Sequence, residues 1–231
     1  MIGISKTQRD PIEQALKAAT ARYAGTPREF RWYARLKYRM DPCYRAIARR
    51  VLRDSFTVDL GTGLGMLPVL LAELGEGRRV LGVDWDPGKM RCGLQAARGL
   101  PAVELVEGDL HVTPLPVCDV ITLVDVLHYY ETDRQEALLK RCRAALRPGG
   151  RLLIREADVS RQGGARWTRL VETWATRLGW NRGPGVHFRP ISELRSSLVK
   201  LGFRVDEEEV AGRYHPGNVL LEAVVEPPQN P

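Results

Sequence analysis

The fold is decided by the stretch Val58-Asp59-Leu60-Gly61-Thr62-Gly63-Leu64-Gly65, in which a short apolar run leads into three alternating glycines. The residues over 55–60 predict a buried strand, and the apolar run over 64–74 predicts a helix. Glycine is needed where a backbone adopts positive φ and approaches a ligand closely. The stretch therefore predicts a strand, a ligand-binding turn and a helix, in that order.

Strands and helices continue to alternate along the chain. Strands are predicted over 79–83, 102–106, 120–124 and 151–155, and helices over 87–98 and 133–146. This alternation is typical of a parallel sheet with right-handed crossovers. A helix over 191–201 then precedes strands over 203–209 and 218–225. We predict an α/β fold, a doubly wound, mostly parallel seven-stranded sheet (Rossmann-like) with a terminal antiparallel β-hairpin.

Two segments add to this sheet. Residues 1–53 are patterned as helices and are predicted to form an N-terminal lid, and residues 54–231 form the main domain. An insert over 157–190 leaves the sheet at the carboxyl end of a strand, where open α/β sheets bind ligands. It contains Trp167, Trp174 and Trp180. On a helix the first two would share a face, which either anchors the insert to the core or lines an acceptor pocket.

The bulk composition is that of an ordinary globular protein, with 44% hydrophobic and 27% charged residues. No apolar run approaches the roughly 20 residues of a membrane-spanning helix, and residues 1–24 lack the apolar core of a signal peptide. We therefore expect a cytoplasmic protein without a membrane anchor. The four cysteines form no CxxC pair, and we expect free thiols in packing positions: Cys43, Cys92, Cys118 and Cys142.

The formal net charge is +7, from 35 basic and 28 acidic residues. A basic chain can bind nucleic acid. Here 29 of the basic residues are arginines spread along the chain, with only moderate density over 28–53. We expect acidic small substrates or solubility, and not a nucleic-acid partner, to account for the charge. RNA or protein modification stays open as a second hypothesis.

Asp59 narrows the chemistry of the ligand. A dinucleotide site places a pyrophosphate against such a turn and the following helix N-terminus, and a carboxylate there would repel it. S-adenosylmethionine has no phosphate and carries an ammonium, a carboxylate and a sulfonium group. The spacing also reads GxGxG and not the GxGxxG of nicotinamide enzymes. Asp59 therefore favours a cationic nucleoside over NAD.

Four elements, in order, resemble the class I S-adenosylmethionine-dependent methyltransferases over residues 55–225. Residues 59–65 are similar to the first motif of that family, 80–84 to its second, 108–110 to its adenine position, and 146–154 to the turn before its fifth strand. The resemblance implies S-adenosylmethionine as cofactor. The donor-site residues that it implies are Asp59, Gly61, Thr62, Gly63, Gly65, Asp84, Trp85, Gly108, Asp109, Leu110, Val124 and Asp125.

The resemblance also implies roles for single residues. Asp84 would accept hydrogen bonds from both ribose hydroxyls. Asp109 would bind the exocyclic amine of adenine, and Leu110 would pack on its ring. Trp85 would either shield the adenosine or belong to the core. Apart from the family, Asp84 could be a helix N-cap and Asp109 a turn residue.

The residues over 125–130 would face the transferred methyl group. They lack the Asn/Asp-Pro-Pro-aromatic motif of amino-methylating nucleic-acid enzymes and the Pro-Cys nucleophile of cytosine C5 enzymes. Residues 155–158 differ from the paired ligands of metal-dependent catechol O-methyltransferases, so no metal is expected. His128 resembles the histidine with which plant-type small-molecule O-methyltransferases deprotonate a phenol, a task that suits a near-neutral pKa. Many members with other acceptors also carry a histidine here.

We therefore predict methyl transfer to a small-molecule acceptor, a hydroxyl on an aromatic or polyketide-like compound, by a monomer or homodimer. His128 and His187 are the candidate catalytic residues, with a structural role as the alternative for His187. Candidate substrate contacts are Tyr33, Tyr129 and Trp180. A partner protein that binds the donor without catalysis is a further alternative, against which the intact donor-site carboxylates argue.

Overall fold

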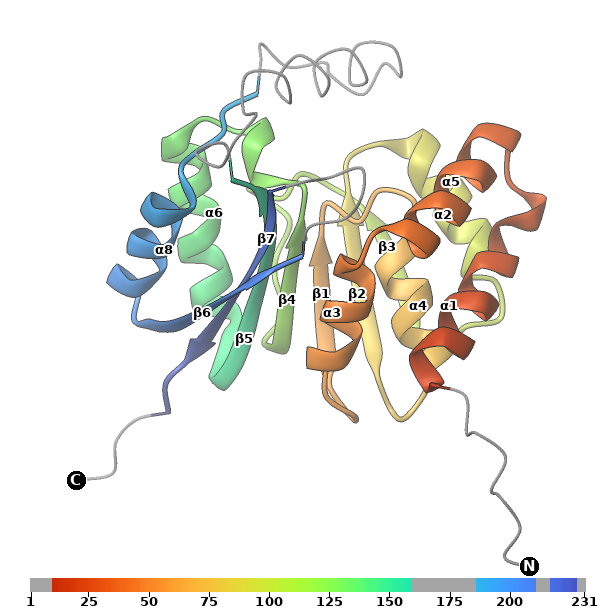
Figure 1. Ribbon diagram of the computed structural model, residues 1–231, viewed down its shortest axis with the longest axis horizontal. Coiled ribbons are helices and arrows are strands. Elements are labelled where there is room, and N and C mark those ends of the chain that lie inside the picture. The colour runs from red at the N-terminus through yellow and green to blue at the C-terminus, as the bar shows by residue number, and fades with distance from the viewer. Residues whose placement is uncertain (1–9, 159–185, 211–216, 228–231) are drawn as a thin grey trace, which may run out of the picture.

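One seven-stranded sheet organises the molecule in the computed structural model, which describes residues 10–158, 186–210 and 217–227 (Figure 1). Its strands, in the order β3-β2-β1-β4-β5-β7-β6, are β1 (Phe56–Leu60), β2 (Arg79–Asp84), β3 (Val103–Glu107), β4 (Cys118–Val124), β5 (Leu146–Ala157), β6 (Phe203–Glu209) and β7 (Asn218–Val225). Within this sheet β7 runs antiparallel to both of its neighbours, whereas the other pairs are parallel. The predicted doubly wound sheet with a terminal hairpin is confirmed.

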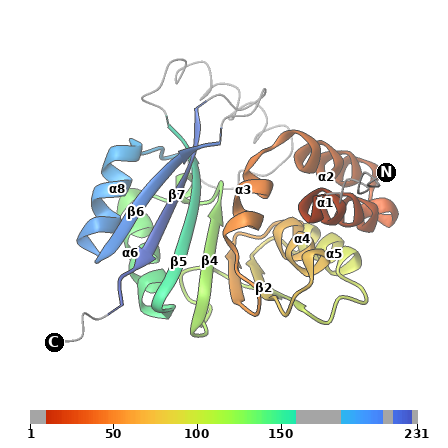
Figure 2. The same cartoon turned by 60° about the horizontal axis from the view of Figure 1, so that its bottom comes forward.

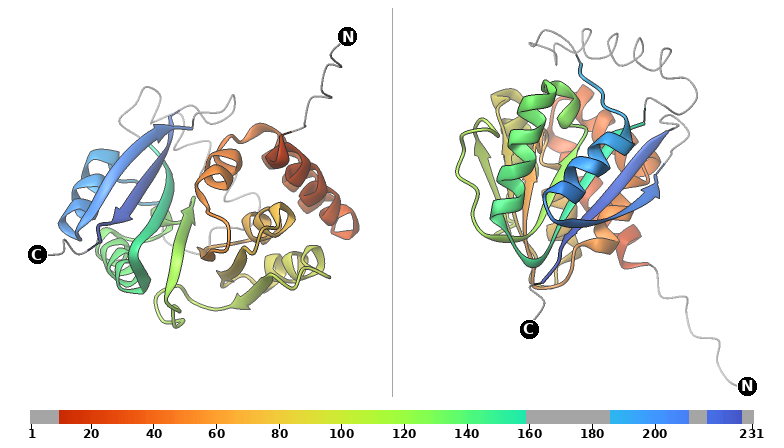
Figure 3. Two further views of the ribbon diagram at one scale, coloured as in Figure 1. Left: turned by 90° about the horizontal axis from the view of Figure 1, so that it is seen from below. Right: turned by 90° about the vertical axis from the view of Figure 1, so that its left-hand side faces the viewer.

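Helices cover both faces of the sheet (Figures 2 and 3). They are α1 (Pro11–Arg22), η1 (Tyr23–Gly25), α2 (Arg28–Met40), α3 (Cys43–Arg50), α4 (Met66–Leu74), α5 (Pro87–Ala96), η2 (Leu127–Tyr129), α6 (Thr132–Ala145) and α8 (Ile191–Lys200). Leu139 of α6 and Leu198 of α8 belong to the core on one face. Leu16, Ile47 and Leu70, from α1, α3 and α4, belong to the core on the other.

The first crossover helix begins later than its apolar run suggests. Gly65 has φ +68°, so α4 starts at Met66 and not at Leu64. A second difference concerns β5, which begins at Leu146 and contains the predicted turn. Its pairing with β4 shifts register between Cys118 and Val120, and Gly149 has φ +76°. The turn is therefore an irregularity within the strand, of the kind that a bulge produces.

Buried tyrosines fasten the N-terminal helices to the segment after β1. The Tyr23 hydroxyl donates to the Leu64 carbonyl at 2.9 Å, and the Tyr38 hydroxyl donates to the Met66 carbonyl at 2.7 Å. The Tyr44 ring lies edge-on to Tyr38 with 5.3 Å between ring centroids. These contacts hold α1, α2 and α3 against the start of α4, beside the glycine turn.

Two simpler expectations concern cysteines and membranes. All four cysteines are buried and unpaired, as predicted for packing residues. No helix among the described residues is long and apolar enough to cross a bilayer. The tryptophans of the predicted insert, Trp167, Trp174 and Trp180, lie outside the described residues.

Candidate active site

A cavity of about 470 Å³ lies at the carboxyl ends of the central strands, a volume typical of small-molecule sites. The strand order reverses between β1 and β4, and such a switch point is where open α/β sheets bind ligands. The predicted donor-site residues that line the cavity are Asp59, Gly61, Thr62, Gly63, Asp84, Trp85, Leu110, Val124 and Asp125. Tyr33 and Tyr129, the predicted substrate contacts within the described residues, line it too.

The glycine turn forms the floor of this cavity. Gly61 has φ +76°, and a Cβ atom there would lie 2.4 Å from Cγ2 of Val126, so both conformation and space exclude a side chain. The Gly63 N–H donates to Asp84 Oδ2 at 2.7 Å, and the Asp86 N–H donates to Asp84 Oδ1 at 2.9 Å. Each carboxylate oxygen has a second lone pair, so Asp84 can still accept hydrogen bonds from a ligand.

Asp84 does not cap a helix. The N-cap of α5 is Asp86, whose Oδ1 accepts from the N–H groups of Gly88 and Lys89 at 2.8 and 3.1 Å. The alternative interpretation of Asp84 as an N-cap is therefore wrong. Its carboxylate is buried at the end of β2 and lines the cavity.

Asp59 is a buried carboxylate in β1 with hydroxyl partners. Its side chain accepts from the Thr122 hydroxyl at 2.5 Å. Burial raises the pKa of Asp59 to about 6, although the hydrogen bond from Thr122 acts to lower it. A desolvated carboxylate at the cavity wall attracts a positively charged ligand, because a nearby cation stabilises its ionised form.

Three predicted donor-site residues do not line the cavity. Gly65 has φ +68° at the start of α4, and a Cβ atom there would lie 3.1 Å from Cδ1 of Leu105 in β3 and 3.5 Å from Cα of Gly93 in α5, so it serves turn conformation and close packing. The Gly108 N–H donates to the Asp84 carbonyl at 2.9 Å. Asp109 is half exposed, and its Oδ1 accepts from the His111 N–H at 2.8 Å. Both of the latter shape the turn after β3, from which Leu110 reaches the cavity.

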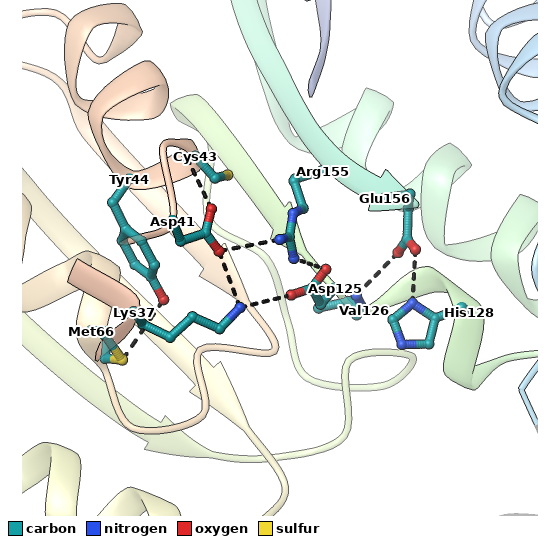
Figure 4. A network of polar contacts seen from close by, with 10 residues as sticks. All are labelled: Lys37, Asp41, Cys43, Tyr44, Met66, Asp125, Val126, His128, Arg155 and Glu156. Carbon is teal, nitrogen blue, oxygen red and sulfur yellow. Dashed lines mark hydrogen bonds and ion pairs between the residues drawn. The ribbon is translucent and has the colours of Figure 1, made fainter. Parts of the chain in front are cut away.

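A network of four charged side chains lies at the β4 end of the cavity, and two of them, Lys37 and Asp125, line it (Figure 4). Arg155 of β5, with a side chain 2% exposed, pairs with Asp125 at the end of β4 and, at 3.1 Å, with Asp41. Lys37 of α2 lies 3.1 Å from Asp41 Oδ2 and 3.6 Å from Asp125 Oδ2. Burial acts to raise the pKa of Asp125, but Arg155 and Lys37 outweigh it and hold that pKa well below its usual range.

Sequence reasoning missed most of this network. It identified Asp125 but not Lys37, Asp41 or Arg155. A signal was present, because Arg155 and Glu156 end an apolar strand that is buried on both sides. Charged residues are almost never fully buried unless they are paired.

His128 is buried in η2 and faces an acidic partner. Its Nδ1 lies 2.7 Å from Glu156 Oε2, and Glu156 Oε1 accepts from the N–H groups of Val126 and Leu127 at 3.2 and 2.9 Å. Burial acts to lower the pKa of His128, but Glu156 outweighs it and the pKa is raised. The ring of Phe188 stacks on it at 4.8 Å. His128 does not itself line the cavity, whereas Val126 and Tyr129 on either side of it do.

A backbone hydrogen bond places His187 next to His128. Its N–H donates to the His128 carbonyl at 2.7 Å, and its own carbonyl accepts from the Gln135 side chain at 2.9 Å. It does not line the cavity. The described residues contain no cluster of three or more His, Cys, Asp or Glu that could hold a metal ion.

Comparisons with known proteins identify methyltransferases as relatives of this chain. Residues 58–154 match a family described as a methyltransferase domain. Acetylserotonin O-methyltransferase of Mus musculus is 32% identical over 169 residues, which are 68% of this chain and 41% of that protein. Demethylspheroidene O-methyltransferase of Rhodobacter capsulatus is 36% identical over 115 residues, 47% of this chain and 27% of that protein. The chain thus spans less than half the length of these relatives.

The fold also matches solved structures. Human N-acetylserotonin methyltransferase, in complex with S-adenosylmethionine, superposes with a TM-score of 0.62 at 20% identity. The match covers 93% of this chain and 56% of the human one. The pyocyanin biosynthetic protein PhzM gives a TM-score of 0.67 at 19% identity, over 94% of this chain and 62% of that protein.

Proposed function

Since this chain belongs to the class I S-adenosylmethionine-dependent methyltransferases, we propose that it transfers a methyl group from that donor to a hydroxyl of a small aromatic or polyketide-like molecule. The observation that carries the choice of a hydroxyl is the pairing of His128 with Glu156 at 2.7 Å. In the sequence, His128 lies between Val126 and Tyr129, which both line the cavity. Two relatives named as O-methyltransferases, of acetylserotonin and of demethylspheroidene, support the same choice.

The residues at the cavity fit this donor. Asp84, held by two backbone N–H groups, would accept hydrogen bonds from the two ribose hydroxyls, and Leu110 would pack against the adenine. Asp59 would face the positive charge of the donor. The glycine turn would allow close approach of the backbone at Gly61 and Gly63. When bound, the donor supplies a sulfonium that carries an activated methyl group.

The enzyme's own part is to orient the acceptor and to take its proton. With Nδ1–H of His128 donating to Glu156, the neutral imidazole leaves Nε2 as the proton acceptor. The hydroxyl proton would pass to Nε2 as the oxygen receives the methyl group from the sulfonium, which leaves as the neutral thioether, and Glu156 would stabilise the resulting imidazolium. General-base catalysis of this kind contributes about 10²–10⁴-fold. Tyr33 and Tyr129, which line the cavity, are the proposed acceptor contacts.

Radiolabelled methyl transfer to a panel of phenols that includes N-acetylserotonin tests the proposal. For any phenol that wild type methylates, we expect His128→Ala to lower kcat about 10²–10⁴-fold. The base works only when neutral, so wild-type kcat should rise with pH through the raised pKa of His128. In Glu156→Gln that rise should move to lower pH. Normal turnover of a phenol by His128→Ala would contradict the base role.

Donor binding is tested separately. Calorimetry should detect uptake of S-adenosylhomocysteine by wild type and by His128→Ala alike, because the proposed role of His128 concerns the acceptor's proton and not contact with the donor. Binding of NAD(H) without uptake of either adenosyl compound would overturn the methyltransferase proposal itself.

One observation favours a second candidate, the modification of RNA. Four arginines of α2 are exposed, Arg28, Arg31, Arg35 and Arg39. Phosphate contacts of this kind make affinity fall steeply with salt. Retention of a mixed RNA sample at low salt, lost on replacing these four arginines by glutamine, would support it. No retention by wild type at low salt would dismiss it.

A further inference from the structure

Three carboxylates and three cations share the cavity wall. The carboxylates are Asp59, Asp84 and Asp125, and the cations are Lys37, Lys89 and Arg134. A methyl donor of the proposed kind carries a cationic sulfonium, an ammonium and one carboxylate. The wall therefore has more than one cation that could receive the single anionic group, and their positions decide between them.

The cations are spread across the sheet. Arg134 lies 3.9 Å from Asp109, on the β3 side, and over the ring of Tyr130 at 5.3 Å from its centroid. Lys89 lies 3.6 Å from Asp86 at the start of α5, on the β2 side. Both are therefore on the side where Asp84 would hold the ribose.

Lys37 stands at the other end of the cavity. Its ammonium is 3.6 Å from Asp125 at the end of β4, and the strand order puts β4 on the far side of β1 from β2 and β3. With the adenine at Leu110 beside β3 and the ribose at Asp84, the amino-acid part of the donor would extend across β1 towards β4. Lys37 is then the lining cation that meets this part.

The buried network holds this ammonium in position. Lys37 contacts Asp41 at 3.1 Å and lies over the ring of Tyr33, 6.0 Å from its centroid. Arg155 shares both carboxylates with it, so two cations and two carboxylates balance. An ammonium has three N–H groups. Among the described residues, the printed contacts of the Lys37 ammonium with carboxylates are one hydrogen bond, to Asp41, and a longer ion pair with Asp125.

From this arrangement, we propose that Lys37 receives the carboxylate of the methyl donor and makes the site selective for donors that carry one. The proposal rests on the proposed function. It assigns a role to the N-terminal helices, because Lys37 lies outside residues 58–154, the part that matches the methyltransferase family. The competing explanation is that Lys37 only balances Asp41 and Asp125.

Two donors separate these explanations: S-adenosylmethionine and decarboxylated S-adenosylmethionine, titrated calorimetrically into the full chain. Wild type should bind the carboxylated donor about 10- to 100-fold more tightly, the range of a hydrogen bond between charged groups. Lys37→Met should lose that preference by weakening only the carboxylated donor. Lys37→Arg keeps the cation and should retain it. The matched control is Lys17→Met, an exposed position on α1, which should bind both donors as wild type does.

The outcomes are distinguishable. If wild type binds both donors equally well, or if Lys37→Met weakens both by one factor, the proposal is overturned while the proposed function stands. If wild type binds neither, the proposed function fails and the proposal fails with it. If the Lys37→Met chain does not fold, Lys37→Gln replaces it as the variant that should lose the preference, and equal affinity of wild type for both donors still overturns the proposal.

Discussion

The two ends of the cavity are built in different ways. At the β2 end, the ligand would meet a backbone turn with one carboxylate, Asp84, fixed by two N–H groups. At the β4 end it would meet Lys37 and Asp125, side chains held by a buried ion-pair network. The first end depends on conformation and space, and the second on charge balance. Substitutions at the β2 end should therefore mainly reduce ligand affinity, and substitutions in the network at the β4 end should mainly reduce stability.

The largest effect is expected at the centre of the network. Arg155→Met removes the most deeply buried cation of the network and leaves Asp41 and Asp125 with Lys37 alone. Removal of one partner of a buried pair costs about 3–5 kcal/mol. The matched control on the same strand is Arg151→Met, whose partly exposed pair with Glu222 should be worth at most about 1 kcal/mol. Urea unfolding of both variants measures the difference. Equal losses would mean that the network is not a special source of stability.

The glycine turn should instead lose ligand affinity. In Gly61→Ala the new Cβ must displace Val126, and overpacking of about 1–3 kcal/mol corresponds to roughly 5- to 150-fold weaker binding of S-adenosylhomocysteine. Gly75→Ala is the control, because it has φ +66° but no atom within 4 Å of the new Cβ. It should strain the backbone and leave the affinity unchanged. Calorimetry that finds both variants equally weakened would remove the steric explanation.

Two of the three acidic residues that line the cavity, Asp59 and Asp125, should differ in their pH response. Asp59, with a pKa of about 6, loses its charge between pH 7 and 5, so affinity for a cationic donor should fall about 10-fold over that range. Asp59→Asn should bind weakly without this pH dependence. Asp125 stays ionised there, since Arg155 and Lys37 lower its pKa, so Asp125→Asn should keep the dependence. A calorimetric pH series that is flat for wild type would contradict this assignment.

The same ionisation affects stability with a definite sign. Because the pKa of Asp59 is raised on folding, the native chain holds this proton when the unfolded chain has released it. The contribution of Asp59 to the free energy of unfolding is therefore greatest below the unfolded pKa, near 4, and is lost as the pH rises through about 6. A ligand that supplies a cation offsets this loss.

The smallest effect is expected where the N-terminal helices meet the turn. Tyr38→Phe removes a 2.7 Å hydrogen bond to the Met66 carbonyl and should cost about 1 kcal/mol. Tyr44→Phe removes only a 3.7 Å contact to the Met66 sulfur, and thioether sulfur is a weak acceptor, so its cost should be smaller. Thermal unfolding compares the two, and a larger loss for Tyr44→Phe would contradict the ranking.

Local sequence patterns predicted most of the fold and the β2 end of the cavity. Strand and helix order follow from hydrophobic periodicity, and the turn from Gly61 and Gly63, because these depend on residues close in sequence. For the same reason Asp59 and Asp84 could be identified from their place beside the turn and at a strand end. Gly65 and Gly108 belong to the same motifs, yet they serve packing and turn geometry, which their spacing does not reveal.

The other end of the cavity was decided only by the tertiary structure. Asp41 and Arg155 are 114 positions apart, and His128 and Glu156 are 28 apart. No periodicity connects such pairs, because they meet where α2, β4 and β5 converge in the packed chain. The sequence alone, through hydrophobic periodicity and the glycine residues, determined the architecture and the position of the glycine turn. Tertiary packing determined which charged side chains are buried together. In the folded interior little water screens these charges, so the stability of each buried charge depends on its partner.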